Sequence, residues 1–220
     1  MRAAALVTAA GSSQRFGGSM KKEYLPLGTG TVLSNAISPF SNPGIFTNLV
    51  VTIPEGGEME AANALQDFPR AEEVIFVSGG ASRQASVLAG LQALARYKPD
   101  VVLIHDGARP WCSQGIAEAV ALRALEAGAC APAVPAVDAM KILSRDGFII
   151  DNLSRETTYR IQTPQGFVFE DILEAHIKAA EDGGIYIDDT EIYGRYIGAV
   201  ATVPGDETNR KITYQEDLKP

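Results

Sequence analysis

Residues 6–27 have the sequence LVTAAGSSQRFGGSMKKEYLPL, and this stretch decides the fold. An apolar run over residues 3–7 leads into it and predicts a buried first β-strand. Small residues follow the strand at once, and the first larger side chain of the loop is Gln14. Such a loop brings backbone N–H groups close to phosphate oxygens. We therefore expect a nucleotide-binding loop made of Ala9, Ala10, Gly11 and Ser12.

Cations follow the small residues on the same loop. Arg15 comes first, and the pair Lys21 and Lys22 comes next. A nucleoside triphosphate needs such cations, because its charges must be held and the charge that develops during transfer must be offset. The catalytic candidates are Arg15 and Lys22. The alternative is a tight strand-to-helix turn with surface cations, and the glycine spacing fits neither a dinucleotide-binding loop nor a P-loop.

The composition bounds the class of protein. With 220 residues, 46% of them hydrophobic, the chain predicts a single domain over residues 1–220. Its 19 basic and 27 acidic residues give a formal charge of −8, which favours a small anionic ligand over nucleic acid. The sequence has neither an apolar run of membrane-spanning length nor a secretory pattern. Cys112 and Cys130 have no metal-site spacing, so we expect free thiols and a cytoplasmic location.

Short apolar runs alternate along the chain with segments whose apolar residues recur at the spacing of an α-helix. This alternation predicts an α/β fold, a Rossmann-like three-layer sandwich with a mostly parallel sheet and right-handed crossovers. A further strand at residues 129–137 contains two prolines, which predict an edge position or an exit from the sheet. The other expected strands are residues 3–7, 48–53, 73–77 and 101–104, and the expected helices include residues 31–40, 59–68, 82–94 and 113–128.

Two more loops follow strands of the predicted sheet. Gly79 and Gly80 stand between a strand and a helix, whose first N–H groups can bind anionic or polar ligand groups; the alternative is a helix cap needed for folding. Asp106 ends the apolar strand at residues 101–104 and lies where α/β proteins bind ligands. Its carboxylate can hold Mg²⁺ together with phosphates; the alternative is a cap or turn residue. Because the three loops share one sheet edge, we favour the functional interpretation.

The segment over residues 138–158 does not continue the alternation of strands and helices. It contains short strand-like pieces and a hairpin turn at Asp146-Gly147. We expect too little apolar material for it to bury itself, which a protruding β-arm packed on another subunit would explain. The alternative is an ordinary surface hairpin. Arg155 lies near the end of this segment.

Eight ordered motifs resemble a known family. AAGSSQRFG and KKEYL resemble the signature of the sugar-nucleotide pyrophosphorylase and cytidylyltransferase superfamily. With GGASRQASVLAGL, HDGARPW, PAVDAMK, QTPQGF, DDTE and NRKIT-YQEDL, nearly the whole chain resembles the 2-C-methyl-D-erythritol 4-phosphate cytidylyltransferases of the non-mevalonate isoprenoid pathway. Three positions depart from the family pattern. Lys21 stands where the family usually has proline, and Ala139 and Ile187 stand where it usually has threonine.

The resemblance implies an enzyme that condenses CTP with 2-C-methyl-D-erythritol 4-phosphate, releasing pyrophosphate. It implies Mg²⁺ at Asp106 and a homodimer that exchanges its arms, with Arg155 acting in the partner's site. The residues implied for the nucleotide, besides the first loop, are Gly80, Ala81, Arg83, Ser86, Asp106, Gly107 and Ala108. The residues implied for the second substrate are Arg109, Asp138, Arg155, Thr163 and Lys211.

Three other functions stay open. A sister enzyme acting on another polyol phosphate, such as ribitol 5-phosphate, would use the same CTP motifs. A nucleotide-sensing protein without catalysis would not need both Arg15 and Lys22. A Rossmann dehydrogenase is disfavoured by the glycine spacing.

Overall fold

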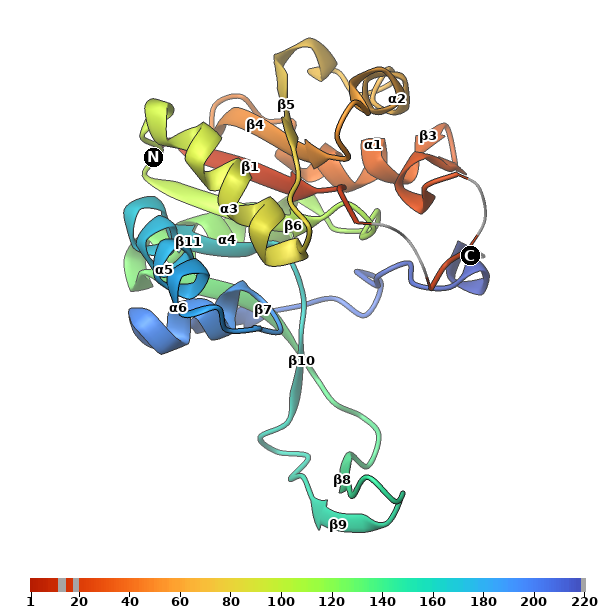
Figure 1. Cartoon of the computed structure of the whole chain (residues 1–220), viewed down its shortest axis with the longest axis vertical. Helices are drawn as coiled ribbons and strands as arrows, with labels where there is room; N and C mark the ends of the chain where they lie inside the picture. Colours follow the sequence, from red (N-terminus) through yellow and green to blue (C-terminus); the bar gives the residue numbers. More distant parts are fainter. Residues whose placement is uncertain (12–14, 18–19, 219–220) are drawn as a thin grey trace.

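In the computed structural model, which describes residues 1–11, 15–17 and 20–218, a mixed, mainly parallel sheet forms the centre of the molecule (Figure 1). Within this described part the sheet has eight strands in the order β10-β7-β11-β6-β1-β4-β5, with β12 paired to β7. The predicted α/β class with a mostly parallel sheet is confirmed. The strands are β1 (Ala3–Thr8), β4 (Phe46–Ile53), β5 (Val74–Ser78), β6 (Val101–Asp106), β7 (Ala129–Pro135), β10 (Tyr159–Ile161), β11 (Gln165–Val168) and β12 (Ala201–Pro204).

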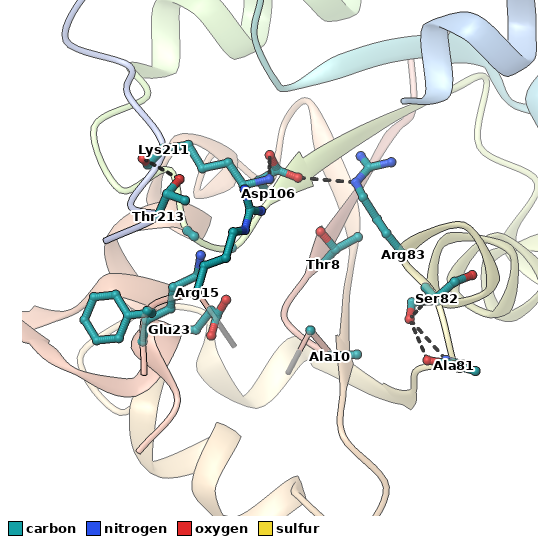
Figure 2. Close-up of a pocket in the computed structure, with 17 residues that line it drawn as sticks. Thr8, Ala10, Arg15, Glu23, Ala81, Ser82, Arg83, Asp106, Lys211 and Thr213 are labelled. Atoms are coloured by element: carbon teal, nitrogen blue, oxygen red, sulfur yellow. Dashed lines mark hydrogen bonds and ion pairs between the residues drawn. The ribbon is translucent and has the colours of Figure 1, made fainter. Parts of the chain in front are cut away.

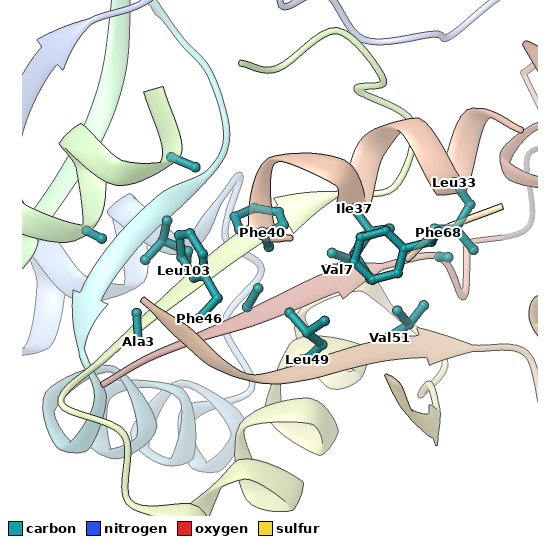
Figure 3. Close-up of a cluster of buried hydrophobic side chains, with 14 of the residues drawn as sticks. Ala3, Val7, Leu33, Ile37, Phe40, Phe46, Leu49, Val51, Phe68 and Leu103 are labelled. Carbon is teal, nitrogen blue, oxygen red and sulfur yellow. The ribbon is translucent and has the colours of Figure 1, made fainter. Parts of the chain in front are cut away.

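Helices cover both faces of the sheet, because its central strands are apolar on both faces. Side chains alternate along a strand, so Ala5 and Val7 of β1 enter one core and Ala4 and Leu6 enter the other. The first core packs α1, α2 and α4 (Figure 3), and the second packs α3, α5 and α6. The helices are α1 (Val32–Ile37), α2 (Glu58–Ala64), α3 (Arg83–Leu94), α4 (Gln114–Ala127), α5 (Phe169–Asp182) and α6 (Asp189–Tyr196).

The first predicted helix is shorter than expected. Thr31 caps it, because the Thr31 hydroxyl accepts a hydrogen bond from the Ser34 N–H at 3.0 Å. The helix gives way to a 3-10 turn at Ser38–Phe40, because Pro39 has no N–H to continue the hydrogen bonding of the α-helix. The short elements are η1 (Lys22–Tyr24), β2 (Pro26–Leu27), β3 (Gly30–Thr31), η2 (Ser38–Phe40), η3 (Ala71–Glu73), η4 (Ala95–Tyr97) and η5 (Gln215–Leu218).

The two prolines of β7 predicted an edge position or an exit from the sheet, and the edge position is wrong. The carbonyls of Pro132 and Ala133 accept hydrogen bonds from the N–H groups of Gln162 and Gly205, at 2.9 Å each. Successive carbonyls of a strand point to opposite edges, so β7 is paired along both edges. Pro132 is tolerated because it lies between the residues paired with β11 and those paired with β10, where the ladder is already interrupted.

The segment over residues 138–158 forms a hairpin that lies apart from the main sheet (Figure 1). Its strands β8 (Lys141–Leu143) and β9 (Ile149–Asn152) pair with each other, and the turn contains Gly147 at φ 85°. The apolar residues that the arm does contain are not buried by the chain itself: Phe148, Ile149 and Ile150 are 62–72% exposed. An exposed apolar hairpin has the chemistry of a surface that another protein covers.

The structure also bears on membrane insertion. Across residues 1–11, 15–17 and 20–218, we find no helix that combines the length and the apolar character needed to cross a membrane.

Candidate functional site

The carboxyl ends of β1, β5 and β6 meet at one edge of the sheet and enclose a cavity of about 710 Å³ (Figure 2). The register places Thr8 opposite Asp106, and the Gly107 N–H donates to the Thr8 carbonyl at 3.0 Å. The loops that follow these three strands therefore come together, as expected from their sequence.

Two glycines let the loops approach one another. A Cβ at Gly79 would stand 2.2 Å from the Ala10 Cβ, and a Cβ at Gly107 would stand 2.9 Å from the Thr8 carbonyl oxygen. Any larger residue would therefore push the loops apart and change the cavity.

The cavity brings together most of the predicted nucleotide and catalytic residues. Ala9 is buried beneath the loop, and Ser12 lies outside the described residues. The predicted residues that line the cavity are Ala10, Gly11, Arg15, Lys22, Gly80, Ala81, Arg83, Ser86, Asp106, Gly107, Ala108 and Lys211. Sequence reasoning missed the lining residues Thr8, Phe16, Glu23, Ser82 and Thr213.

The Gly80 loop is held by hydroxyl groups of its own helix. Ser82 caps α3, accepting from the Ala85 N–H at 3.0 Å. The Ser86 hydroxyl accepts from the Gly80 N–H at 3.1 Å and donates to the Ser82 carbonyl at 2.9 Å. Ser86 thus fixes the shape of the loop from beneath, in addition to lining the cavity.

Asp106 lies in a cluster of cations. Its carboxylate is 2.8 Å from the Lys211 ammonium and 3.5 Å from the guanidinium groups of both Arg83 and Arg109. Figure 2 shows Lys211 and Arg83 on opposite sides of it. Burial alone would raise the pKa of Asp106, but these three cations hold that pKa well below its usual range. Asp106 therefore stays ionised and keeps the cations together.

Lys22 reaches the cavity from the 3-10 turn η1. Its ammonium donates to the Ile212 carbonyl at 2.6 Å, and the residue is only 8% exposed. Burial lowers the pKa of Lys22. Lys21 instead donates to the Gly11 carbonyl on the first loop. Among the described lining residues, four are cationic and two are acidic, so the cavity suits an anion.

The segment that carries Lys211 is tied to several parts of the site. The Ile212 N–H donates to the Ala108 carbonyl at 2.8 Å, and the Gln215 amide donates to the Phe16 carbonyl at 3.3 Å. Lys211 and Thr213 line the cavity from this segment. The site is thus closed by residues that are far from the first loop in sequence.

Of the residues predicted for the second substrate, Arg109 and Thr163 lie beside Asp106. The Thr163 hydroxyl oxygen accepts from the Asp106 N–H at 3.1 Å, and the Arg109 guanidinium donates to the Asn209 carbonyl at 2.7 Å. Asp138 and Arg155 are exposed on the hairpin segment, and they are not among the described residues that line the cavity.

An acidic residue that sequence reasoning did not assign completes the cluster. Asp189, at the start of α6, accepts from the Arg83 guanidinium at 2.7 Å and is fully buried. Its signal in the sequence is the DDTE motif at residues 188–191.

The fold and this cation-rich cavity define an α/β protein with an anion-binding site at the carboxyl edge of its sheet. The model of the family IspD, 2-C-methyl-D-erythritol 4-phosphate cytidylyltransferase, matches residues 3–220. The chain belongs to this family. Among solved structures, the 2-C-methyl-D-erythritol 4-phosphate cytidylyltransferase of Thermus thermophilus is 31% identical, with a TM-score of 0.80 and coverage of 99% of this chain and 96% of that one. The 4-diphosphocytidyl-2C-methyl-D-erythritol synthase of Anaerococcus prevotii is 26% identical, with a TM-score of 0.85 over 98% and 92% of the two chains.

Curated relatives are longer than this chain. The bifunctional enzyme IspD/IspF of Bradyrhizobium diazoefficiens is 40% identical over 221 residues, covering 99% of this chain and 54% of the relative. The chain thus spans about half the length of the curated relatives it matches.

Proposed function

We propose that this protein is a cytidylyltransferase that condenses CTP with 2-C-methyl-D-erythritol 4-phosphate, giving 4-diphosphocytidyl-2-C-methyl-D-erythritol and pyrophosphate. The observation that carries the proposal is the cation-rich cavity at the carboxyl edge of the sheet, built from the loops that carry the family motifs. A cavity of about 710 Å³ has room for a nucleotide-sized ligand.

The proposed chemistry needs alignment and charge neutralisation. The attacking phosphate oxygen of the second substrate is already a nucleophile at neutral pH, so catalysis requires no general base. The first loop and the Gly80 loop would hold the nucleotide for in-line attack at the α-phosphorus. Arg15 and Lys22 would stabilise the charge that develops there and on the leaving pyrophosphate.

We further propose that Mg²⁺ enters the site with the nucleotide. In the part of the chain that the structure describes, no group of three His, Cys, Asp or Glu side chains could hold a metal alone. Mg²⁺ is commonly held by one or two carboxylates together with substrate phosphates, so the carboxylate of Asp106, which lines the anion cavity, fits it. When bound, the ion would neutralise phosphate charge.

Replacing Asp106 by asparagine tests the metal assignment. Asp106→Asn removes a carboxylate charge, so we expect the Mg²⁺ concentration for half-maximal rate to rise about tenfold or more. Titrating Mg²⁺ in a pyrophosphate-release assay measures this, and binding of Mn²⁺ followed by electron spin resonance supplies a readout without turnover. Full activity of the wild-type protein in excess chelator would exclude the metal.

For the second substrate we propose Arg109, Thr163 and Lys211 from one chain, with Asp138 and Arg155 supplied by a partner's arm. The exposed apolar hairpin supports a homodimer of this kind. We also propose a single nucleotidyltransferase domain over residues 1–220 with the arm at residues 138–158. The free cysteines Cys112 and Cys130 support a cytoplasmic location.

One experiment tests the function against its alternatives. The protein is incubated with CTP, Mg²⁺ and either 2-C-methyl-D-erythritol 4-phosphate or ribitol 5-phosphate, and pyrophosphate release is measured. We expect faster release with the methylerythritol substrate. Preference for ribitol 5-phosphate would assign the sister activity, for which the nonstandard Ala139 and Ile187 offer a cause. Binding of CTP without release in either mixture would indicate a nucleotide sensor.

A further inference from the structure

A buried imidazole and a buried carboxylate connect Arg83 to the helices α5 and α6. One carboxylate oxygen of Asp189 accepts from the Arg83 guanidinium at 2.7 Å, and the other is 3.1 Å from the Nε2 atom of His176. Both His176 and Asp189 are completely buried, whereas the Arg83 side chain is 31% exposed and lines the cavity. The two buried residues therefore contact the site through Arg83.

The hydrogen bonds assign the proton on His176. A carboxylate only accepts hydrogen bonds, so the Nε2 atom must carry a proton to bond with Asp189. The Nδ1 atom is buried and has no hydrogen-bond partner among the described residues. A proton on Nδ1 would be buried without an acceptor, which is costly. His176 therefore donates a hydrogen bond from Nε2 to Asp189.

The helix ends explain why Arg83 needs this support. Arg83 is the first residue of α3, where the positive end of the helix dipole repels a cation. Asp189 is the first residue of α6, where the dipole favours an anion. Burial would raise the pKa of Asp189, but Arg83 and His176 hold it at about 2. Asp189 thus supplies a permanent charge that offsets the unfavourable position of Arg83.

The Arg83 guanidinium contacts two carboxylates, those of Asp189 and Asp106. Its Nη2 atom contacts Asp189 at 2.7 Å, and its Nε atom contacts Asp106 at the longer distance of 3.5 Å. In Figure 2 the guanidinium lies beside Asp106 at the cavity. If Asp189 lost the His176 N–H, its carboxylate would be free to turn, and Arg83 would move toward a closer pair with Asp106. That pairing would remove positive charge from the anion site.

We propose that His176 and Asp189 are positioning residues that direct Arg83 toward the nucleotide and thereby set the affinity for CTP. This inference rests on the proposed function. The role of His176 is to donate one N–H to Asp189, so a side chain that keeps a donor at the same reach should replace it, and an apolar side chain of similar size should not.

The test measures CTP binding by calorimetry in the presence of Mg²⁺ and without the second substrate. We expect His176→Leu to weaken CTP binding about tenfold, the scale of one charge-assisted hydrogen bond, and Asp189→Asn to weaken it at least as much. His176→Gln, whose amide can donate at the position of Nε2, should stay within about twofold of wild type. Ile172→Val is the matched control, because Ile172 is buried on the same helix and belongs to the packing core.

A spectroscopic readout supports the binding test if His176→Leu fails to fold. The chain contains two histidines, so the nitrogen shifts of His176 are assigned by their disappearance in His176→Gln. We expect a proton on Nε2, and an Nε2 atom without a proton overturns the inference.

The outcomes separate this inference from the proposed function. If the wild-type protein does not bind CTP, both the proposed function and the positioning role are overturned. If wild type binds CTP and His176→Leu binds it equally well, only the positioning role is overturned. Equal losses in His176→Leu, His176→Gln and Ile172→Val would show a packing effect and would also overturn it.

Discussion

Lys22→Ala should lower kcat by at least about a hundredfold, the scale for loss of one donor that acts on charge developing in a transition state. Lys22 lines the cavity, and its ammonium is held at 2.6 Å from the Ile212 carbonyl, so a bound triphosphate would find this charge already placed. The KM for CTP should change less than kcat. Single-turnover pyrophosphate release at saturating CTP measures the effect.

The control for this prediction separates catalysis from stability. Loss of the Lys22 ammonium also leaves the Ile212 carbonyl without that donor, which costs on the order of 1 kcal/mol of folding free energy. Thermal unfolding shows whether the variant is folded at the assay temperature. Lys21→Ala is the matched variant, because Lys21 donates to the Gly11 carbonyl. Near-normal turnover in Lys22→Ala, with a large loss in Lys21→Ala, would transfer the role to Lys21.

A mixture of two inactive variants should regain roughly a quarter of wild-type activity if the arm acts across a dimer. One subunit carries Lys22→Ala and its partner carries Arg155→Ala. In a mixed dimer one site contains both substitutions, Lys22→Ala and Arg155→Ala. The other site contains an intact Lys22 from one chain and an intact Arg155 from its partner. Random pairing makes half of the dimers mixed, and half of their sites are whole, which gives the quarter.

The structural reason for this expectation is the hairpin itself. Arg155 is exposed next to an apolar hairpin that lies apart from the main sheet (Figure 1). Co-expression with two different affinity tags and two-step purification yields the verified mixed dimer, in which half of the sites are whole, so the purified dimer should have about half of wild-type activity. If Arg155 acts within its own chain, every site keeps one lesion, and a mixed dimer as inactive as its parents would refute the shared site. A single-tag mixture of each variant with wild type calibrates the assay.

The sequence predicts those parts of the site that lie directly after a strand. The first loop, Gly80 and Asp106 all follow apolar runs, so their meeting at one sheet edge follows from parallel topology. Asp189 was not predicted as a site residue, because its partner Arg83 is distant in sequence and the contact depends on how α3 packs on α5 and α6.

Other differences arise where tertiary pairing overrides local preference. The prolines of β7 favour an edge strand, but β10, β11 and β12 all pair with it. The hairpin at residues 138–158 was located from its turn residues, whereas the exposure of its apolar side chains required the three-dimensional arrangement. A one-dimensional pattern predicts that a residue is apolar and does not say whether the chain itself covers it.

The late position of Lys211 and Thr213 has a consequence for synthesis of the protein. The ribosome makes the first loop early, but the cavity lacks one wall until the segment that contains Ile212 has been released and has bonded to Ala108 and Lys22. A nascent chain therefore cannot be stabilised by nucleotide at the complete site, because a ligand stabilises only the state that binds it. The sheet must reach its arrangement unaided, and a ligand of the cavity can protect the protein against unfolding only after this segment has emerged and folded.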